Sequence, residues 1–248
     1  MSKLPIALQL YTVRDQMEKD AAGTLNAVAD IGYEFVEVAG LAGLSAADFR
    51  KLADAAGLKV ISGHMSVDDI EGTARDAKIL GLTFVGCGMP GPLREKGEEG
   101  FRTHAKNLEK AAYALKEHGI TLTYHNHSFE FVKFGDKYGL DILYGESAPD
   151  SLQAQFDVYW VQHGGEPPAE YITKWAARCK TIHLKDMLPD EAKTFAEVGE
   201  GILDWPAIFE AAAKIKPAWY IVEQDRCQRP SLESAKMSFD NLKKWGYV

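Results

Sequence analysis

The stretch FRTHAKNLEKAAYALKEHGITLTY, residues 101–124, contains the unit that decides the fold. Residues 101–118 carry apolar side chains at helical spacing, and Gly119 follows them as a helix-ending glycine. The next residues, 121–124, form a short β-rich run. The sequence therefore predicts a helix that leads directly into a strand, the repeating unit of a parallel sheet covered by helices.

The same helix-ending glycine followed by a β-rich run recurs along the chain. Gly32, Gly57 and Gly81 each end a helical pattern and are followed at once by a β-rich run, in GYEFVEV, GLKVIS and GLTFVG. Ser45 and Asp68 precede two further helical patterns as N-caps. These additional helices are predicted at residues 45–56, 68–80 and 205–214.

Counting the β-rich runs fixes the expected architecture. They lie at residues 6–10, 35–38, 59–62, 83–85, 121–124, 152–156, 181–184 and 219–222. Eight strand–helix units in 248 residues predict an α/β fold, a single (β/α)8 TIM barrel that forms one domain over residues 1–248. A doubly wound open sheet is the competing architecture, but no glycine-rich dinucleotide turn follows the first run.

Composition narrows the class of protein. The chain has 36 acidic and 28 basic residues, a formal charge of −8 and no basic stripe, which argues against a nucleic-acid partner. Its three cysteines lie far apart and are expected to be reduced. No signal peptide or membrane span is recognised, so a soluble cytoplasmic protein with no membrane partner is expected.

Residues 89–100, MPGPLREKGEEG, are predicted to be a loop, either mobile over the barrel mouth or an ordinary connection.

Ionisable residues gather at the predicted strand ends, where TIM barrels carry their active sites. Five of the seven histidines lie at or just beyond strand ends, namely His64, His125, His127, His163 and His183. A glutamate after the fifth strand, an aspartate ending the sixth, a histidine in the seventh and a glutamate ending the eighth would converge on the barrel axis. Such oxygen-rich donors suit Mn²⁺, Mg²⁺ or Co²⁺, and a salt-bridge network at the rim is the alternative interpretation.

Five segments carry a family resemblance in this order: YHNHSFEF (124–131), FDVYW (156–160), TIHLKDM (181–187), GEGILDW (199–205) and IVEQD (221–225). The ordered set, which spans essentially the whole chain, resembles the sugar phosphate isomerase/epimerase group of the xylose-isomerase-like TIM-barrel superfamily. The nuclease branch, similar to endonuclease IV, instead uses Asp-x-x-His where this chain has Trp160, so no metal cluster is expected.

The resemblance implies one divalent metal ion, with Mn²⁺ favoured over Mg²⁺, Co²⁺ or Zn²⁺. The implied ligands are Glu130, Asp157, His183 and Glu223. At the fifth strand, Glu130 is the first choice and His125 the alternative.

The resemblance also implies an isomerase or epimerase of a ketose or keto-sugar, acting through an enediolate with Glu130 and Glu223 as paired acid and base. Lys185 and His125 would assist in catalysis. An unphosphorylated sugar is favoured by the residues themselves, because the last two loops offer Lys185, Arg226 and Arg229 but no glycine-rich phosphate cradle. The expected sugar-binding residues are Gln9, Tyr11, Glu37, His64, His127, Trp160, His163 and Arg229. The alternatives are a keto-sugar dehydratase similar to inosose dehydratase and a non-catalytic sugar-binding barrel, and a homo-oligomer is left open.

Overall fold

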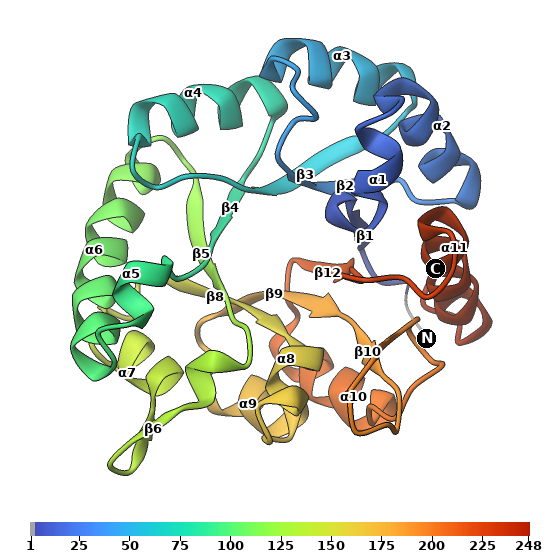
Figure 1. Ribbon diagram of the computed structural model, residues 1–248. Helices are drawn as coiled ribbons and strands as arrows, with labels where there is room; N and C mark the ends of the chain where they lie inside the picture. The colour runs from blue at the N-terminus through green and yellow to red at the C-terminus, as the bar shows by residue number, and fades with distance from the viewer. Residues whose placement is uncertain (1–2) are drawn as a thin grey trace.

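The computed structural model, which describes residues 3–248, has a closed barrel of parallel strands at its centre. Neighbouring strands around the barrel follow the order β1, β12, β9, β8, β5, β4, β3, β2. Helices form the outer ring (Figure 1). The predicted single (β/α)8 TIM barrel is thereby confirmed.

The elements have the following bounds. The barrel strands are β1 (Ile6–Gln9), β2 (Phe35–Ala39), β3 (Lys59–His64), β4 (Phe84–Cys87), β5 (Thr121–His125), β8 (Gln153–Asp157), β9 (Cys179–Leu184) and β12 (Trp219–Val222). The longer helices are α2 (Ala21–Ile31), α3 (Ala46–Ala55), α4 (Ile70–Leu80), α6 (Glu98–Glu117), α7 (Gly139–Gly145), α9 (Pro168–Lys174), α10 (Trp205–Ile215) and α11 (Ser231–Lys244). The shorter helices are η1 (Leu10–Val13), α1 (Arg14–Met17), α5 (Gly91–Arg94), η2 (Phe129–Phe131) and α8 (Val158–His163). Two small two-stranded sheets lie outside the barrel. One pairs β6 (Lys133–Phe134) with β7 (Lys137–Tyr138), and the other pairs β10 (Asp186–Met187) with β11 (Phe195–Ala196).

The predicted strands and helix ends agree closely with these bounds. Gly119 ends α6 with a φ of 78°, the left-handed conformation that the helix-to-strand turn requires. Ser45 caps α3 as predicted, since its hydroxyl accepts a hydrogen bond from Asp48 N at 3.1 Å. The N-cap predicted at Asp68 is wrong, because Asp69 accepts the capping hydrogen bond from Gly72 N.

The loop predicted over residues 89–100 is wrong for most of its length. Helix α5 lies within it, and α6 already begins at Glu98. The two helices meet at Gly100, where a Cβ atom would lie 1.8 Å from the carbonyl oxygen of Leu93. Gly100, one of the glycines that suggest a loop, thus allows a close contact between two helices.

The barrel interior changes from apolar to polar along its axis. Near the N-terminal ends of the strands, Ala7, Ile61 and Ile221 form a small buried cluster, separate from the large core between strands and helices. Further along, the inward side chains include Gln9, Glu37, Gln155, Thr181 and His183, all fully buried. Because inward positions alternate along a strand, this polar layer leads to the C-terminal mouth of the barrel.

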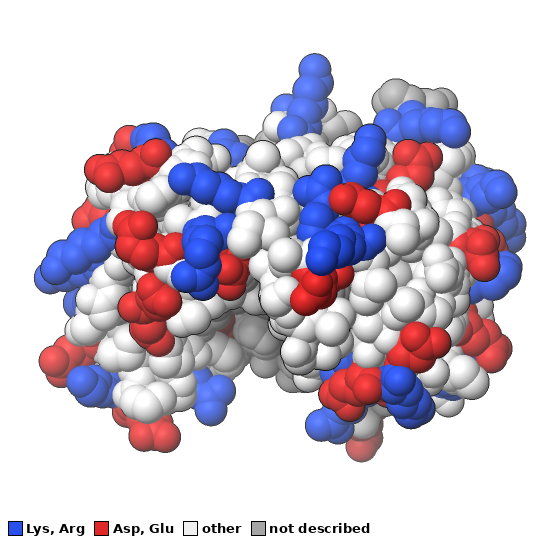
Figure 2. Space-filling view, turned by 90° about the horizontal axis from the view of Figure 1, so that it is seen from above, with Lys and Arg blue, Asp and Glu red and all other residues white. Residues whose placement is uncertain are grey.

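The two ends of the described chain lie close together. Leu4 N donates to Tyr247 O at 2.7 Å, so the beginning and end of the described chain meet beside α11. Across residues 3–248, no helix is long and apolar enough to span a membrane. On the face in Figure 2, basic and acidic side chains are interspersed rather than gathered into one charged area.

Candidate active site

An open cavity lies at the C-terminal ends of the barrel strands. Its volume is about 790 Å³, within the range of small-molecule binding sites. Its lining includes Tyr11, Arg14, His64, His125, His127, Tyr159, Trp160, His163, Lys185, Phe195, Glu223, Asp225 and Arg226. Six of the predicted sugar-binding or catalytic residues on the rim therefore share this cavity with Lys185 and Glu223: Tyr11, His64, His125, His127, Trp160 and His163.

Four buried side chains form a group that could hold a metal ion. His125, Asp157, His183 and Glu223 each offer one donor atom, and these atoms lie within 4.8 Å of one another. The residues come from the ends of β5, β8, β9 and β12, which are consecutive around the barrel. Asp157 is also paired in register with His183 across β8 and β9. The structure thus brings together Asp157, His183 and Glu223, three of the four ligands that the resemblance implies.

Glu130, the first choice for the fifth-strand ligand, is not brought to this group. The η2 turn directs its fully buried carboxylate to Tyr124 Oη and His127 N, both 2.8 Å away. Burial raises the pKa of Glu130 to about 7, although these two hydrogen bonds lower it. His125, the alternative, takes the fifth-strand position because it is the last residue of β5 and its side chain faces inward. The structure therefore does not pair Glu130 with Glu223 across the cavity.

Lys185 lies among the carboxylates at the floor of the cavity. Its Nζ atom is 2.9 Å from Asp157 Oδ2, 2.7 Å from Glu223 Oε2 and 2.6 Å from Asp225 Oδ1. Burial alone would lower the pKa of Lys185, but these three carboxylates raise it well above its usual value. The side chain is therefore a fixed positive charge beside the four-residue group.

His183 bridges two carboxylates. Its Nδ1 atom lies 2.7 Å from Glu223 Oε2, and its Nε2 atom lies 2.7 Å from Glu37 Oε1. Burial opposes a charge on the ring, but Glu37 and Glu223 raise the pKa of His183 to about 10. Burial opposes ionisation of Glu37 as well, but His183 and His64 lower its pKa to about 2. Without a metal, an imidazolium between two carboxylates is the favoured state.

Gln9 and Glu37 belong to the buried layer below the cavity. The Glu37 carboxylate accepts hydrogen bonds from Gln9 Nε2 at 2.7 Å and Gln155 Nε2 at 2.8 Å, in addition to His183. Both residues have no exposed surface and neither lines the cavity. The interpretation of Gln9 and Glu37 as direct sugar-binding residues is therefore not supported by their positions.

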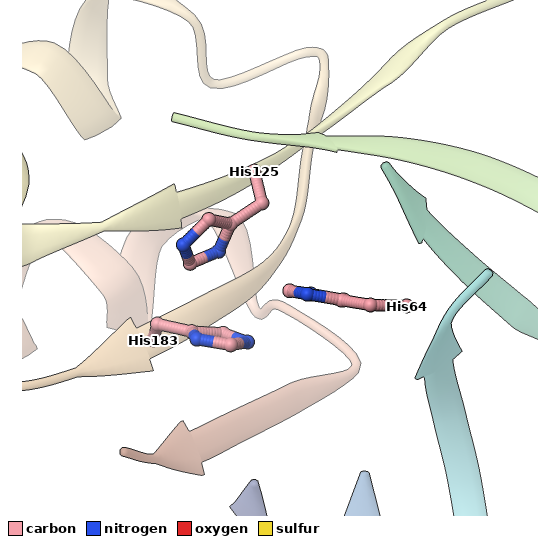
Figure 3. Close-up of side chains that lie close together, drawn as sticks. All are labelled: His64, His125 and His183. Atoms are coloured by element: carbon pink, nitrogen blue, oxygen red, sulfur yellow. The ribbon is translucent and has the colours of Figure 1, made fainter. Parts of the chain in front are cut away.

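Three histidine rings from β3, β5 and β9 point toward one another in the barrel mouth (Figure 3). The ring centroids of His125 and His183 are 4.6 Å apart, and those of His64 and His125 are 5.0 Å apart. Gly86 in β4 leaves room for this cluster, since a Cβ atom there would lie 2.4 Å from His64 Cδ2. Burial, reinforced by neighbouring positive charges, lowers the pKa of His125 well below its usual value, so this ring is neutral at pH 7.

An aromatic wall continues from the histidines toward the outside. Trp160 packs against His127 and His163, with ring centroids 5.4 and 5.3 Å apart, and Phe195 stacks on Tyr159. The buried atoms Trp160 Nε1, His127 Nδ1 and His163 Nδ1 have no hydrogen-bond partner among residues 3–248. Apolar ring faces beside unpaired polar atoms are suited to the C–H groups and hydroxyls of a sugar.

Arg229 lies away from this cavity. Its Nε atom is 3.2 Å from Glu197 Oε1, and its guanidinium contacts Met237 Sδ. The expectation that Arg229 binds substrate is therefore not supported by its position. The predicted site residues did not include Arg14, Tyr159, Phe195, Asp225 and Arg226, which also line the cavity. The usable signal for Asp225 and Arg226 was their place directly after the last predicted strand, where the barrel mouth lies.

Comparisons with known proteins agree with this architecture. A crystal structure described as a sugar phosphate isomerase/epimerase from Parabacteroides distasonis superposes with a TM-score of 0.86 and is 26% identical, covering 98% of this chain and 99% of that one. An inosose dehydratase of Mesomycoplasma hyopneumoniae is 30% identical over 58% of this chain and 54% of its own length. Another, from Clostridium botulinum, is 26% identical over 54% of this chain and 50% of its own length. This chain thus spans about half the length of the curated relatives it matches. Residues 25–245 match the family described as the xylose isomerase-like TIM barrel, and the chain belongs to that family.

Proposed function

We propose that this protein is a metal-dependent enzyme that removes a proton next to the carbonyl group of a ketose or keto-sugar, as an isomerase or epimerase. The observation that carries the proposal is the buried group of His125, Asp157, His183 and Glu223 at the floor of an open cavity. The histidines and aromatic rings that line the rest of that cavity are compatible with a polyhydroxylated substrate.

The four residues fit a divalent metal ion. His125 Nδ1 is buried and makes no hydrogen bond within residues 3–248, so the lone pair of this imidazole is free for a ligand. Asp157 Oδ2 is held there by the ion pair with Lys185 at 2.9 Å. With His125 in place of Glu130, the donor set becomes two imidazoles and two carboxylates. This set accommodates Zn²⁺ and Co²⁺ as well as Mn²⁺, and the preference for Mn²⁺ or Mg²⁺ is weaker than three carboxylates would give. A bound metal would polarise the substrate carbonyl and stabilise the negative charge that follows proton loss.

The residues around the group supply the remaining chemistry. In our proposal Glu223, which lines the cavity, receives the proton from the carbon beside the carbonyl. His127 replaces Glu130 as its partner, because His127 lines the cavity, has an unpaired Nδ1 atom and is kept neutral by burial, which lowers its pKa to about 4. The Lys185 ammonium stabilises the oxyanion of the enediolate.

A keto-sugar dehydratase is the second candidate, and the inosose dehydratase relatives favour it. The first step is the same, but the proton is then delivered to a neighbouring hydroxyl, which leaves as water. Lys185, which is protonated and lines the cavity, could supply this proton.

We favour an unphosphorylated substrate. Lys185 is already paired with three carboxylates, and Arg14 donates to the backbone oxygens of Tyr11 and Asp225. Of the cationic side chains that line the cavity, Arg226 alone has no ion pair or hydrogen bond within residues 3–248. A phosphate group would therefore find few free partners.

One experiment separates the candidates. The protein is stripped with a chelator, reconstituted with Mn²⁺, Co²⁺, Zn²⁺ or Mg²⁺, analysed for metal, and incubated with ketoses and inososes in D₂O. Deuterium at the carbon beside the carbonyl without loss of water indicates an isomerase or epimerase, whereas loss of water indicates a dehydratase. Binding of sugars without metal and without deuterium incorporation would identify a non-catalytic sugar-binding barrel and refute the proposal.

A further inference from the structure

A buried chain of hydrogen bonds runs beneath the candidate metal site. Glu37 in β2 is its centre, because its carboxylate accepts from Gln9 Nε2, Gln155 Nε2 and His183 Nε2 at 2.7, 2.8 and 2.7 Å. Gln155 Oε1 in turn lies 2.7 Å from His64 Nε2. The chain therefore links two histidines of the cavity through residues from β1, β2 and β8.

We propose that Glu37 is a positioning residue that keeps the Nε2 proton on His183, so that His183 binds the metal through Nδ1. The inference rests on the metal site proposed above and deepens it. It assigns to Glu37 neither sugar binding nor metal ligation.

The direction of each hydrogen bond follows from the chemistry of its partners. An ionised carboxylate can only accept, so the groups that face Glu37 must all be donors. Gln155 must direct its amide NH₂ toward Glu37, since its oxygen would be repelled there. Its oxygen is then left to accept a hydrogen bond from His64 Nε2. By the same reasoning, His183 must carry a proton on Nε2.

The opposite side of the His183 ring faces the other donor residues. Nδ1 lies 2.7 Å from Glu223 Oε2, and Asp157 is the register partner of His183 in β8. A histidine held by a carboxylate on one nitrogen is oriented and made more basic at the other, which is a common arrangement around protein-bound metals. Full burial of both Glu37 and His183 keeps bulk water from competing for this hydrogen bond.

The competing arrangement places the metal on the other side of the ring. There, His183 Nε2 and Glu37 Oε1 would act as ligands together with His64 Nε2, which lies 3.5 Å from the same oxygen. That arrangement would require Glu37 to give up its hydrogen bond from His183. The two arrangements use different nitrogens of one ring and can be told apart directly.

The test uses the full-length protein labelled with ¹⁵N-histidine and loaded with ¹¹³Cd²⁺. We expect a one-bond cadmium coupling at His183 Nδ1 and a retained proton on Nε2. Coupling at Nε2 would overturn this inference but leave the proposed metal site intact, whereas absence of any bound metal would overturn both. This measurement needs no variant and does not depend on activity.

A variant measures how much the positioning contributes. In Glu37→Gln, an amide NH₂ replaces one acceptor oxygen, so at least one of the three donors loses its partner. We expect metal affinity to fall about 10- to 100-fold, the range found for partners of metal-binding histidines. Glu34→Gln, the same change at an exposed position just before β2, is the matched control and should bind metal like the wild type. Unchanged affinity in Glu37→Gln would overturn the proposal.

Discussion

A substitution of Asp186 tests which contacts hold the segment that carries Phe195 in the wall of the cavity. Its fully buried Oδ2 atom accepts from Gly199 N, Gly201 N and Trp205 Nε1 at 3.0, 3.1 and 2.7 Å, and Oδ1 accepts from Met187 N and Leu203 N at 2.8 and 3.1 Å. These contacts tie down the segment that carries Phe195, which packs on Tyr159 and Trp160. The carboxylate therefore organises one wall of the cavity from behind.

Replacing Asp186 by Asn removes one acceptor oxygen and puts an NH₂ group in its place. The fewest bonds are lost if the Oδ1 side is converted, and then Met187 N and Leu203 N remain buried without a partner. Each unsatisfied buried donor costs about 1–3 kcal/mol, so we expect Asp186→Asn to lower the free energy of unfolding by about 2–6 kcal/mol.

Urea unfolding of the metal-free proteins, followed by circular dichroism, measures this change through the transition midpoint. Asp190→Asn is the matched control, because Asp190 lies in the same segment, is exposed and accepts from Thr194 N. We expect the control to unfold like the wild type. A loss of less than about 1 kcal/mol in Asp186→Asn would refute the reasoning, since it would mean that the buried donors find other partners.

The remaining predictions concern the metal group. Asp157→Ala and His183→Ala should lose bound metal in elemental analysis, because each leaves three of the four donors; full metal content in either would contradict the site. His125→Ala should lose metal while Glu130→Gln keeps it, and the reverse result would restore Glu130 as the fifth-strand ligand. Glu223→Gln, with metal occupancy confirmed, should slow deuterium exchange into the substrate about 100- to 10,000-fold; exchange at the wild-type rate would move the proton transfer to another residue. In the metal-free protein, the pKa of His183 is raised to about 10 by Glu37 and Glu223 against the effect of burial. The stability it contributes should therefore be complete below about pH 6.5 and be lost as the pH rises toward 10, as urea unfolding in buffers from pH 6 to 10 would detect; a flat profile would argue against the charged ring.

The sequence alone was sufficient for the barrel and for much of the site. Hydrophobic runs, helix-ending glycines and their regular alternation are local signals, because backbone conformation and side-chain period act over a few residues. They gave the eight strands and therefore their C-terminal ends. Asp157, His183 and Glu223 then follow, because inward-facing side chains near the C-terminal ends of barrel strands reach the mouth.

The tertiary structure decided the position of those side chains for which the sequence allows more than one direction. In HNHSFE, both His125 and Glu130 are polar and close to a strand end, but the η2 turn folds Glu130 back onto Tyr124, a residue that faces outward from β5. Glu37 looked like a rim residue because the end of β2 could be located only approximately. The depth of Glu37 in the barrel depends on the register of β2 against β1 and β3. That register buries the Glu37 side chain among Gln9, Gln155 and His183. Such positions depend on contacts between residues as far as 146 apart in the chain, and no local pattern in the sequence carries that information.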